Sequence, residues 1–205
     1  ENASWVHLEG TGGYFFPKGE TLNMRKTNVN PSFFEMWINH GKNPKDAEYS
    51  YVLLPNKSAE ETSEYSANPD ITVISNTKNV QAVKEKNLNM TGYVFWESGE
   101  LNGVGVSTPL ILNITEDNDY VTINASDPTQ KLVKSEIMLD RKLEFAEGDF
   151  EAKSEITSSG TSIKLSLGNA NGKTINIKLK KGGNGNEKND SAADSGSNDD
   201  SADGR

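Results

Sequence analysis

Short runs that are rich in apolar and β-branched residues recur along most of the chain, each with the length of a β-strand. Five such runs, 71–75, 80–84, 91–97, 109–114 and 120–124, follow one another closely, with turn residues between nearly all of them. A parallel α/β sheet would need helices of roughly 10–15 residues between its strands, and these runs are not separated by helical patterns. The pattern therefore predicts an all-β sandwich or barrel.

An earlier pair of strands is predicted on either side of a polar loop. Residues 33–38, FFEMWI, are apolar enough for a strand that is buried on both faces. The loop 39–46 then leads into a second strand at 49–54. Because the two runs are close in sequence, we expect them to pair as an antiparallel hairpin.

A second hairpin is predicted near the end of the chain. Apolar residues alternate with polar ones over 163–167 and again over 175–179. Between them, Asn171-Gly172 can adopt the positive φ angles of a tight turn. We expect these two strands to pair and to pack on one face.

One helix is predicted, from Ser58 to Tyr65. The Ser58 hydroxyl can accept from the amide of Glu61 while the Glu61 carboxylate reaches back, which is the capping box of a helix start. Asn68-Pro69 should end the helix, because proline disfavours the helical conformation of the residue before it.

The composition changes sharply near the end of the chain. Only 33% of all residues are hydrophobic, and beyond residue 181 none is larger than Ala. Such a segment cannot bury enough apolar surface to offset its chain entropy. We predict a disordered acidic tail or linker over 181–205.

The formal charge of −9 makes a nucleic acid an unsuitable partner, because binding phosphates requires clustered cations. The sequence holds no apolar run long enough to span a membrane. The absence of cysteine excludes disulfides, thiolate nucleophiles and Cys-based zinc sites.

Candidate catalytic and metal-binding residues are few. The two histidines, His7 and His40, lack metal-ligand spacing, and we expect His40 to bond the backbone of its Gly-containing turn. The acidic run from Glu116 to Asp119 offers oxygen ligands for calcium, but without the order of an EF-hand loop. We therefore expect no catalytic residue, no metal site and no cofactor in this chain.

Aromatic residues offer another kind of site. Pyranose rings dock on exposed aromatic rings through their apolar faces, although most large aromatics in β proteins pack in the core. Trp5 and Trp96 lie beside polar turns and are the candidates for exposed sugar-binding rings.

Several ordered motifs resemble one enzyme family. They are GGYFFP at 12–17, HGKNPKDAEYSYVLLPN at 40–56, SNTKNVQAV at 75–83, FW at 95–96 and SDPTQ at 126–130. Together they resemble polysaccharide lyase family 8, which includes hyaluronate, chondroitin AC and xanthan lyases.

The resemblance implies a secreted, extracellular enzyme with an N-terminal α/α toroid, a large central β-sandwich and a smaller C-terminal one. Residues 1–69 would be the end of the antiparallel central sandwich and 70–180 the C-terminal sandwich. The chain starts within a strand pattern and without an initiator Met, as expected of a piece of a longer protein.

Catalytic residues of the family lie mainly in the toroid, so this chain alone is expected to be inactive. Its partners would be the toroid of the same enzyme and an acidic polysaccharide, namely hyaluronan, chondroitin or xanthan. Arg25 lies where some members place an arginine that contacts the sugar; otherwise it is an ordinary surface cation.

Two alternatives remain open. The chain could be a non-catalytic carbohydrate-binding or scaffold module, or a segment of a surface adhesin whose acidic linker leads to an anchor.

Overall fold

The computed structural model describes residues 2–28, 30–31, 33–168 and 170–182. This part of the chain contains sixteen strands and a single helix, and all strand pairs in its three sheets are antiparallel. The all-β prediction is therefore confirmed. The predicted tail lies, from residue 183 onward, outside the described residues. Residue 181 itself ends the last strand, so regular structure extends one residue into the segment predicted as tail.

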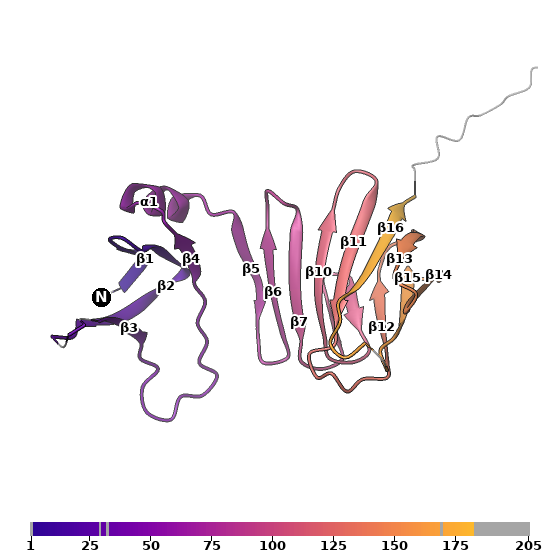
Figure 1. The fold of residues 1–205 in the computed structure, drawn as a ribbon, viewed down its shortest axis with the longest axis horizontal. Helices are drawn as coiled ribbons and strands as arrows, with labels where there is room; N and C mark the ends of the chain where they lie inside the picture. Colours follow the sequence, from indigo (N-terminus) through magenta and orange to yellow (C-terminus); the bar gives the residue numbers. More distant parts are fainter. Residues whose placement is uncertain (1, 29, 32, 169, 183–205) are drawn as a thin grey trace, which may run out of the picture.

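The first sheet is built around one long strand (Figure 1). Its members are β1 (Asn2–Leu8), β2 (Gly12–Lys26), β3 (Phe34–Ile38) and β4 (Val52–Pro55). β1 runs along one edge of β2. β4 pairs with the first residues of the opposite edge and β3 with the last, so β3 and β4 lie end to end beside the same strand.

This arrangement corrects the first predicted hairpin. Strands that share one edge of β2 cannot also pair with each other, and the segment 39–51 is a connection between them. The prediction failed because β2 is 15 residues long and offers both strands a partner.

Helix α1 (Ala59–Ala67) covers one face of this sheet, and its predicted cap is confirmed. The amide of Glu61 donates to Ser58 Oγ (3.1 Å), and the amide of Ser58 donates to Glu61 Oε2 (2.8 Å). Thr62 is fully buried against β2, where a Cβ on Gly13 would stand 2.2 Å from Thr62 Oγ1. Glycine is required there by this close approach of helix and strand.

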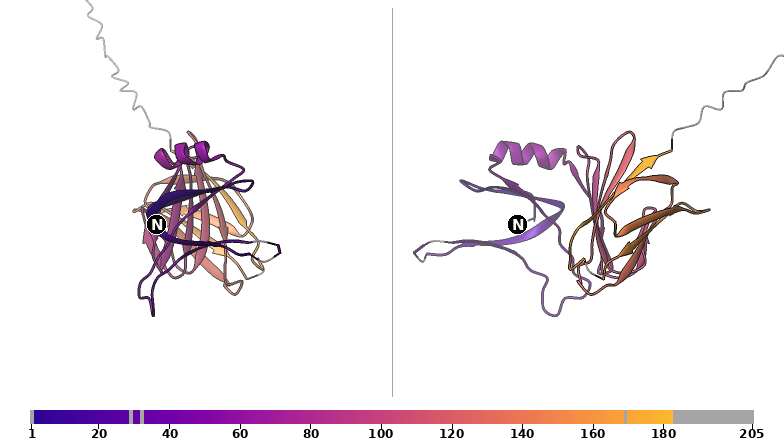
Figure 2. Two further views of the ribbon diagram at one scale, coloured as in Figure 1. Left: turned by 90° about the vertical axis from the view of Figure 1, so that its left-hand side faces the viewer. Right: turned by 45° about the vertical axis from the view of Figure 1, so that its right-hand side comes forward.

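The rest of the described chain forms two facing sheets, visible as two layers in the right-hand view of Figure 2. The seven-stranded sheet has the order β13 (Leu143–Gly148), β16 (Ile175–Lys181), β11 (Tyr120–Ser126), β10 (Leu110–Glu116), β7 (Met90–Phe95), β6 (Val80–Glu85), β5 (Ile71–Asn76). The five-stranded sheet has the order β14 (Ala152–Ile156), β15 (Thr161–Ser166), β12 (Lys134–Leu139), β9 (Val104–Val106), β8 (Gly99–Leu101). Inward-facing aliphatic residues of both sheets form one core, including Leu112, Ile123, Ile137, Ile163 and Ile177.

The second predicted hairpin is also wrong. Asn171 and Gly172 do have positive φ angles (48° and 78°), but the strands on either side belong to different sheets. β15 pairs with β12 and β14, whereas β16 pairs with β11 and β13. Both strands alternate because both face the core between the sheets, and alternation alone does not specify the partner strand.

In the described residues, no helix has the length and apolar character needed to cross a bilayer.

Candidate functional site

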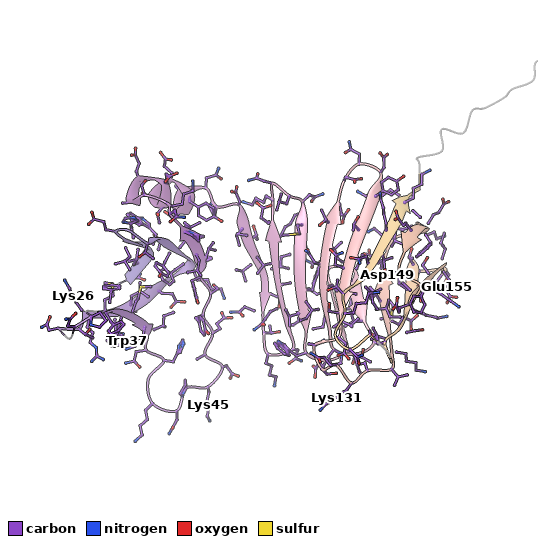
Figure 3. The ribbon with its side chains drawn as sticks, in the orientation of Figure 1. Lys26, Trp37, Lys45, Lys131, Asp149 and Glu155 are labelled. Carbon is purple, nitrogen blue, oxygen red and sulfur yellow. The ribbon has the colours of Figure 1, made fainter. Side chains whose placement is uncertain are left out.

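A hollow lined mainly by apolar and aromatic residues lies on the face of the first sheet opposite α1, with a volume of about 680 Å³. We call it the aromatic groove. Its lining residues are Leu8, Tyr14, Phe16, Leu22, Phe34, Met36, Trp37, Ile38, His40, Tyr49, Tyr51 and Leu53. Figure 3 places Trp37 on this sheet, far from the C-terminal sandwich.

Strand alternation builds the floor of the groove. Phe15 points toward α1, where its ring meets that of Tyr65 edge-on at 5.7 Å. Its neighbours Tyr14 and Phe16 therefore face the other side, as expected for successive residues of a strand. Phe16 and Leu22 are almost completely buried at the base of the groove.

The connection 39–51 forms one wall. The rings of Tyr49 and Tyr51 stack with centroids 6.3 Å apart, and the His40 ring lies 6.2 Å from that of Tyr49. The amide of Gly41 donates to Asn39 Oδ1 (2.9 Å), so the side chain that bonds this turn is Asn39. The expectation that His40 does so is wrong, because its ring packs on Tyr49 instead.

Much of the aromatic groove is open to solvent. Trp37, Tyr49 and Tyr51 are 44%, 58% and 49% exposed. The expectation that 33–38 is buried on both faces is therefore wrong. The sequence did not predict that these aromatic residues are exposed, because an apolar run has the same pattern whether or not another part of the protein covers it. Only the Tyr-x-Tyr spacing at 49–51 indicated that two rings lie on the same side of the chain.

Arg25 lies near the end of β2, directly opposite Glu35 of β3. Its guanidinium forms an ion pair with Glu35 and lies over the Trp37 ring, 6.0 Å from the centroid. The hydrogen bond and charge of Glu35 raise the pKa of Arg25. Arg25 is exposed, but Glu35 already balances its charge.

Trp5 and Trp96 are placed far from Arg25 along the fold. Trp5 is half-buried on β1 opposite Phe15, near the start of β2, whereas Arg25 is near its end. Trp96 follows β7 in the other part of the molecule and is 54% exposed, with its Nε1 donating to Gln81 Oε1 (3.4 Å). The structure does not bring the three predicted residues into one site.

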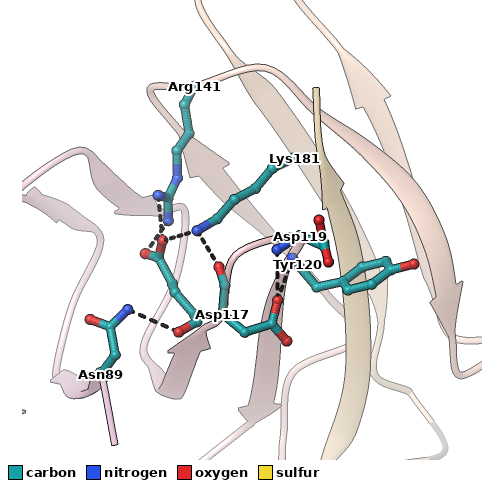
Figure 4. Close-up of polar contacts among 7 residues, drawn as sticks. Asn89, Asp117, Asp119, Tyr120, Arg141 and Lys181 are labelled. Atoms are coloured by element: carbon teal, nitrogen blue, oxygen red, sulfur yellow. Dashed lines mark hydrogen bonds and ion pairs between the residues drawn. The ribbon is translucent and has the colours of Figure 1, made fainter. Parts of the chain in front are cut away.

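The acidic run at 116–119 has structural partners (Figure 4). Arg141 donates to both carboxylate oxygens of Glu116 (2.9 and 2.6 Å), and Lys181 Nζ lies 3.2 Å from Glu116 Oε2. Asp117 Oδ1 accepts from the amides of Asp119 and Tyr120. Hydrogen bonds from Arg141 are the main cause of a lowered pKa of Glu116.

This cluster fixes the connection that crosses from one sheet to the other, because Arg141 lies between β12 of the five-stranded sheet and β13 of the seven-stranded sheet, and Glu116 ends β10 of the seven-stranded sheet. Across the residues that the structure describes, there is no group of three or more His, Asp or Glu side chains that could hold a metal ion.

Comparison with known protein families gives two adjacent matches. Residues 1–66 match the super-sandwich domain of polysaccharide lyase family 8, and residues 72–136 match the C-terminal beta-sandwich domain of the same family.

Two curated relatives are similar in sequence. A xanthan lyase of Bacillus sp. (strain GL1) is 34% identical over 154 residues, and a chondroitinase-AC of Pedobacter heparinus is 31% identical over 148. Each match covers 62% of this chain, but only 17% and 21% of the respective relative. The chain thus spans about one fifth of the length of these relatives.

Two solved lyase structures have a fold similar to that of this chain. A Paenibacillus xanthan lyase is 27% identical and superimposes with a TM-score of 0.79, covering 89% of this chain and 21% of its own. A Streptomyces coelicolor chondroitin AC lyase, solved in complex with chondroitin sulphate, gives a TM-score of 0.78 over 89% of this chain and 27% of its own. At 21% identity, that second likeness concerns the fold alone.

Proposed function

The chain belongs to polysaccharide lyase family 8, and we propose that it forms the C-terminal β-sandwich portion of an enzyme that cleaves a uronate-containing polysaccharide by β-elimination. The similar relatives are lyases of xanthan and chondroitin, and others are hyaluronate lyases. These relatives share one class of substrate, the acidic polysaccharides.

The reaction needs groups that we assign to another part of the enzyme. In β-elimination a base removes the proton next to the uronate carboxyl, the bond to the 4-linked sugar breaks, and a double bond forms in the uronate ring. A proton must also reach the departing oxygen, so a base and an acid have to face the same sugar. We place them in an N-terminal α/α toroid, and by itself this chain is inactive.

The observation that carries this proposal is the open aromatic groove. A stable monomer seldom leaves so many large apolar side chains exposed on one sheet face. Because the chain spans about one fifth of its relatives' length, a further part of the same enzyme is the natural cover for this face. In this role the chain supports the substrate cleft, with Arg25, Trp5 and Trp96 as candidate contacts to the polysaccharide.

The test is to mix this chain with the toroid portion of the same enzyme and to follow the ultraviolet absorbance of unsaturated uronate products from hyaluronan, chondroitin and xanthan. We expect product from the mixture and none from this chain alone. If the complete enzyme gives no unsaturated product from any of the three, the proposal is wrong.

The second candidate is a carbohydrate-binding or scaffold module, favoured by the exposed rings of Trp37 and Trp96. It predicts glycan affinity of this chain with no lyase activity on mixing. Secretion belongs to the same proposal, since polysaccharides of this class are large and occur outside cells, and it is checked by locating the native protein in culture medium or on the cell surface.

A further inference from the structure

A second hollow, about 600 Å³ in volume, lies between the connection 39–51 and the turn that joins β5 to β6. We call it the polar groove. Its lining residues are Asp46, Ala47, Glu48, Tyr49, Asn76, Thr77, Lys78 and Gln81. Unlike the aromatic groove, it is lined mainly by amide, hydroxyl and charged side chains from both parts of the molecule.

Hydrogen bonds hold both sides of the polar groove in place. Asn76 Nδ2 donates to the carbonyl oxygen of Tyr49 (3.0 Å), which joins the turn to the connection. Glu48 forms an ion pair with Lys18 of β2. On the turn, Thr77 Oγ1 accepts from the amide of Val80 (3.1 Å) and donates to its carbonyl oxygen (3.0 Å). The groove is thus a built feature of the fold.

The polar groups left for a ligand suit a sugar. Gln81 Oε1 accepts from Trp96 Nε1 (3.4 Å), which leaves the Gln81 amide nitrogen to donate. Asn76 uses its nitrogen on Tyr49, which leaves its Oδ1 to accept. A donor and an acceptor on adjacent amides match the hydroxyl groups of a pyranose. Beside them, the indole of Trp96 is 54% exposed, an apolar surface for one face of the ring.

A positive charge lies at one end of the groove. Lys78 is exposed and lines the turn side of the groove, and its ammonium has no hydrogen-bond or ion-pair partner in the described part of the chain. Asp46 and Glu48 line the opposite side, where Lys18 balances Glu48. A carboxylate would therefore be drawn toward Lys78.

We propose that the polar groove binds a uronate-containing oligosaccharide segment, with a pyranose on Trp96, its hydroxyls bonded to Gln81 and Asn76, and a carboxylate at Lys78. Such a site would hold the polysaccharide chain on the C-terminal part of the enzyme, away from the reacting bond. Only the class of ligand rests on the proposed function; the site itself rests on the groove.

The three tryptophans provide a direct test by NMR. Each gives one indole N–H signal, and we assign that of Trp96 with a Trp96→Phe variant. Hexasaccharides of hyaluronan and chondroitin and a xanthan-derived oligosaccharide are titrated into the chain, with neutral maltohexaose as control. We expect at least one acidic oligosaccharide to shift the Trp96 signal and leave that of Trp37 in place.

Variants assign the contacts. Trp96→Ala should weaken binding about tenfold, the effect of losing one aromatic platform. Lys78→Gln should weaken it about threefold and reduce its salt dependence, as expected of an exposed charge pair. Lys131→Gln removes an equal exposed charge at the lower edge of the sandwich (Figure 3), outside the lining of the groove, and should change nothing.

Several outcomes would overturn the inference. They are a Trp96 signal unmoved by all three acidic probes, equal binding of maltohexaose, or a shift of Trp37 in place of Trp96. The lyase assay tests the proposed function separately. If the complete enzyme forms product but the Trp96 signal does not shift, only this binding site is rejected. If the Trp96 signal shifts but no product forms, only the lyase proposal is rejected.

Discussion

Glu116 forms ion pairs with two cations of the sandwich, Arg141 and Lys181. Its carboxylate binds Arg141 from the connection between β12 and β13 and Lys181 from β16, and its carbonyl oxygen accepts from Asn89 Nδ2 (2.9 Å). The Glu116 side chain is only 25% exposed, so removing its charge leaves a partly buried guanidinium without its partner. Such a loss costs more than that of a surface ion pair.

We predict that Glu116→Gln lowers the free energy of unfolding at pH 7 by about 1–2 kcal/mol. Because the folded pKa of Glu116 is lowered, its charge stabilises the fold above the unfolded value of about 4.3 and ceases to do so as the pH falls through the folded value. The variant should therefore lose less stability than the original chain when the pH is lowered from about 5 to about 2. Urea unfolding of both proteins at these two pH values measures the difference.

The matched control is Glu9→Gln, which removes a carboxylate from an exposed turn. Its unfolding curves should coincide with those of the original chain at both pH values. Equal effects of the two variants would contradict the assigned role of Glu116.

At the scale of elements, the contact between α1 and β2 is set by one missing side chain. A Cβ on Gly13 would stand 2.2 Å from Thr62 Oγ1 and 2.5 Å from Thr62 Cγ2. Thr62 is fixed in turn, because its hydroxyl donates to the carbonyl oxygen of Ser58 (2.7 Å). The helix can accommodate a larger residue only by moving off the sheet.

Gly13→Ala should therefore lower the free energy of unfolding by about 2–3 kcal/mol, the usual cost of overpacking a close contact. Gly92→Ala is the control, since it lies on β7 with no atom within 4 Å of the added Cβ, and it should change stability by less than about 0.5 kcal/mol. Urea unfolding of both variants makes the comparison. Equal values would mean that α1 does not pack closely on β2.

The elements also separate what the sequence could predict from what it could not. The cap at Ser58 and the turn at Asn171-Gly172 depend on neighbouring residues, and both were predicted. The partners of β3 and β15 depend on distant strands, and both predicted hairpins were wrong. Likewise, the site residues Trp37 and Tyr51 were recognisable as aromatics, but their exposure depends on which other segments cover the sheet.

At the scale of the whole molecule, the two faces of the first sheet differ in how far they are covered. One face is covered by α1, whereas the other leaves Trp37, Tyr51 and Leu53 exposed in the aromatic groove. If a further part of the enzyme covers this groove, these side chains stabilise the assembly and contribute little to the stability of the chain alone. Substituting them should then lower the activity of the assembled enzyme while leaving the stability of this chain nearly unchanged.

We predict that Trp37→Ser combined with Leu53→Ser changes the free energy of unfolding of the chain by less than about 1 kcal/mol, because both side chains are already exposed. The same pair should reduce lyase activity on mixing with the toroid portion by at least about tenfold, since apolar contacts at the centre of an interface carry most of its binding energy. Phe150→Ser is the control: Phe150 is 87% exposed between β13 and β14, at the opposite end of the molecule, and its loss should leave the activity of the mixture unchanged. A double variant that is as active as the original chain would mean that the aromatic groove is not the docking face, whereas a large loss of stability would mean that these side chains already belong to the core of this chain.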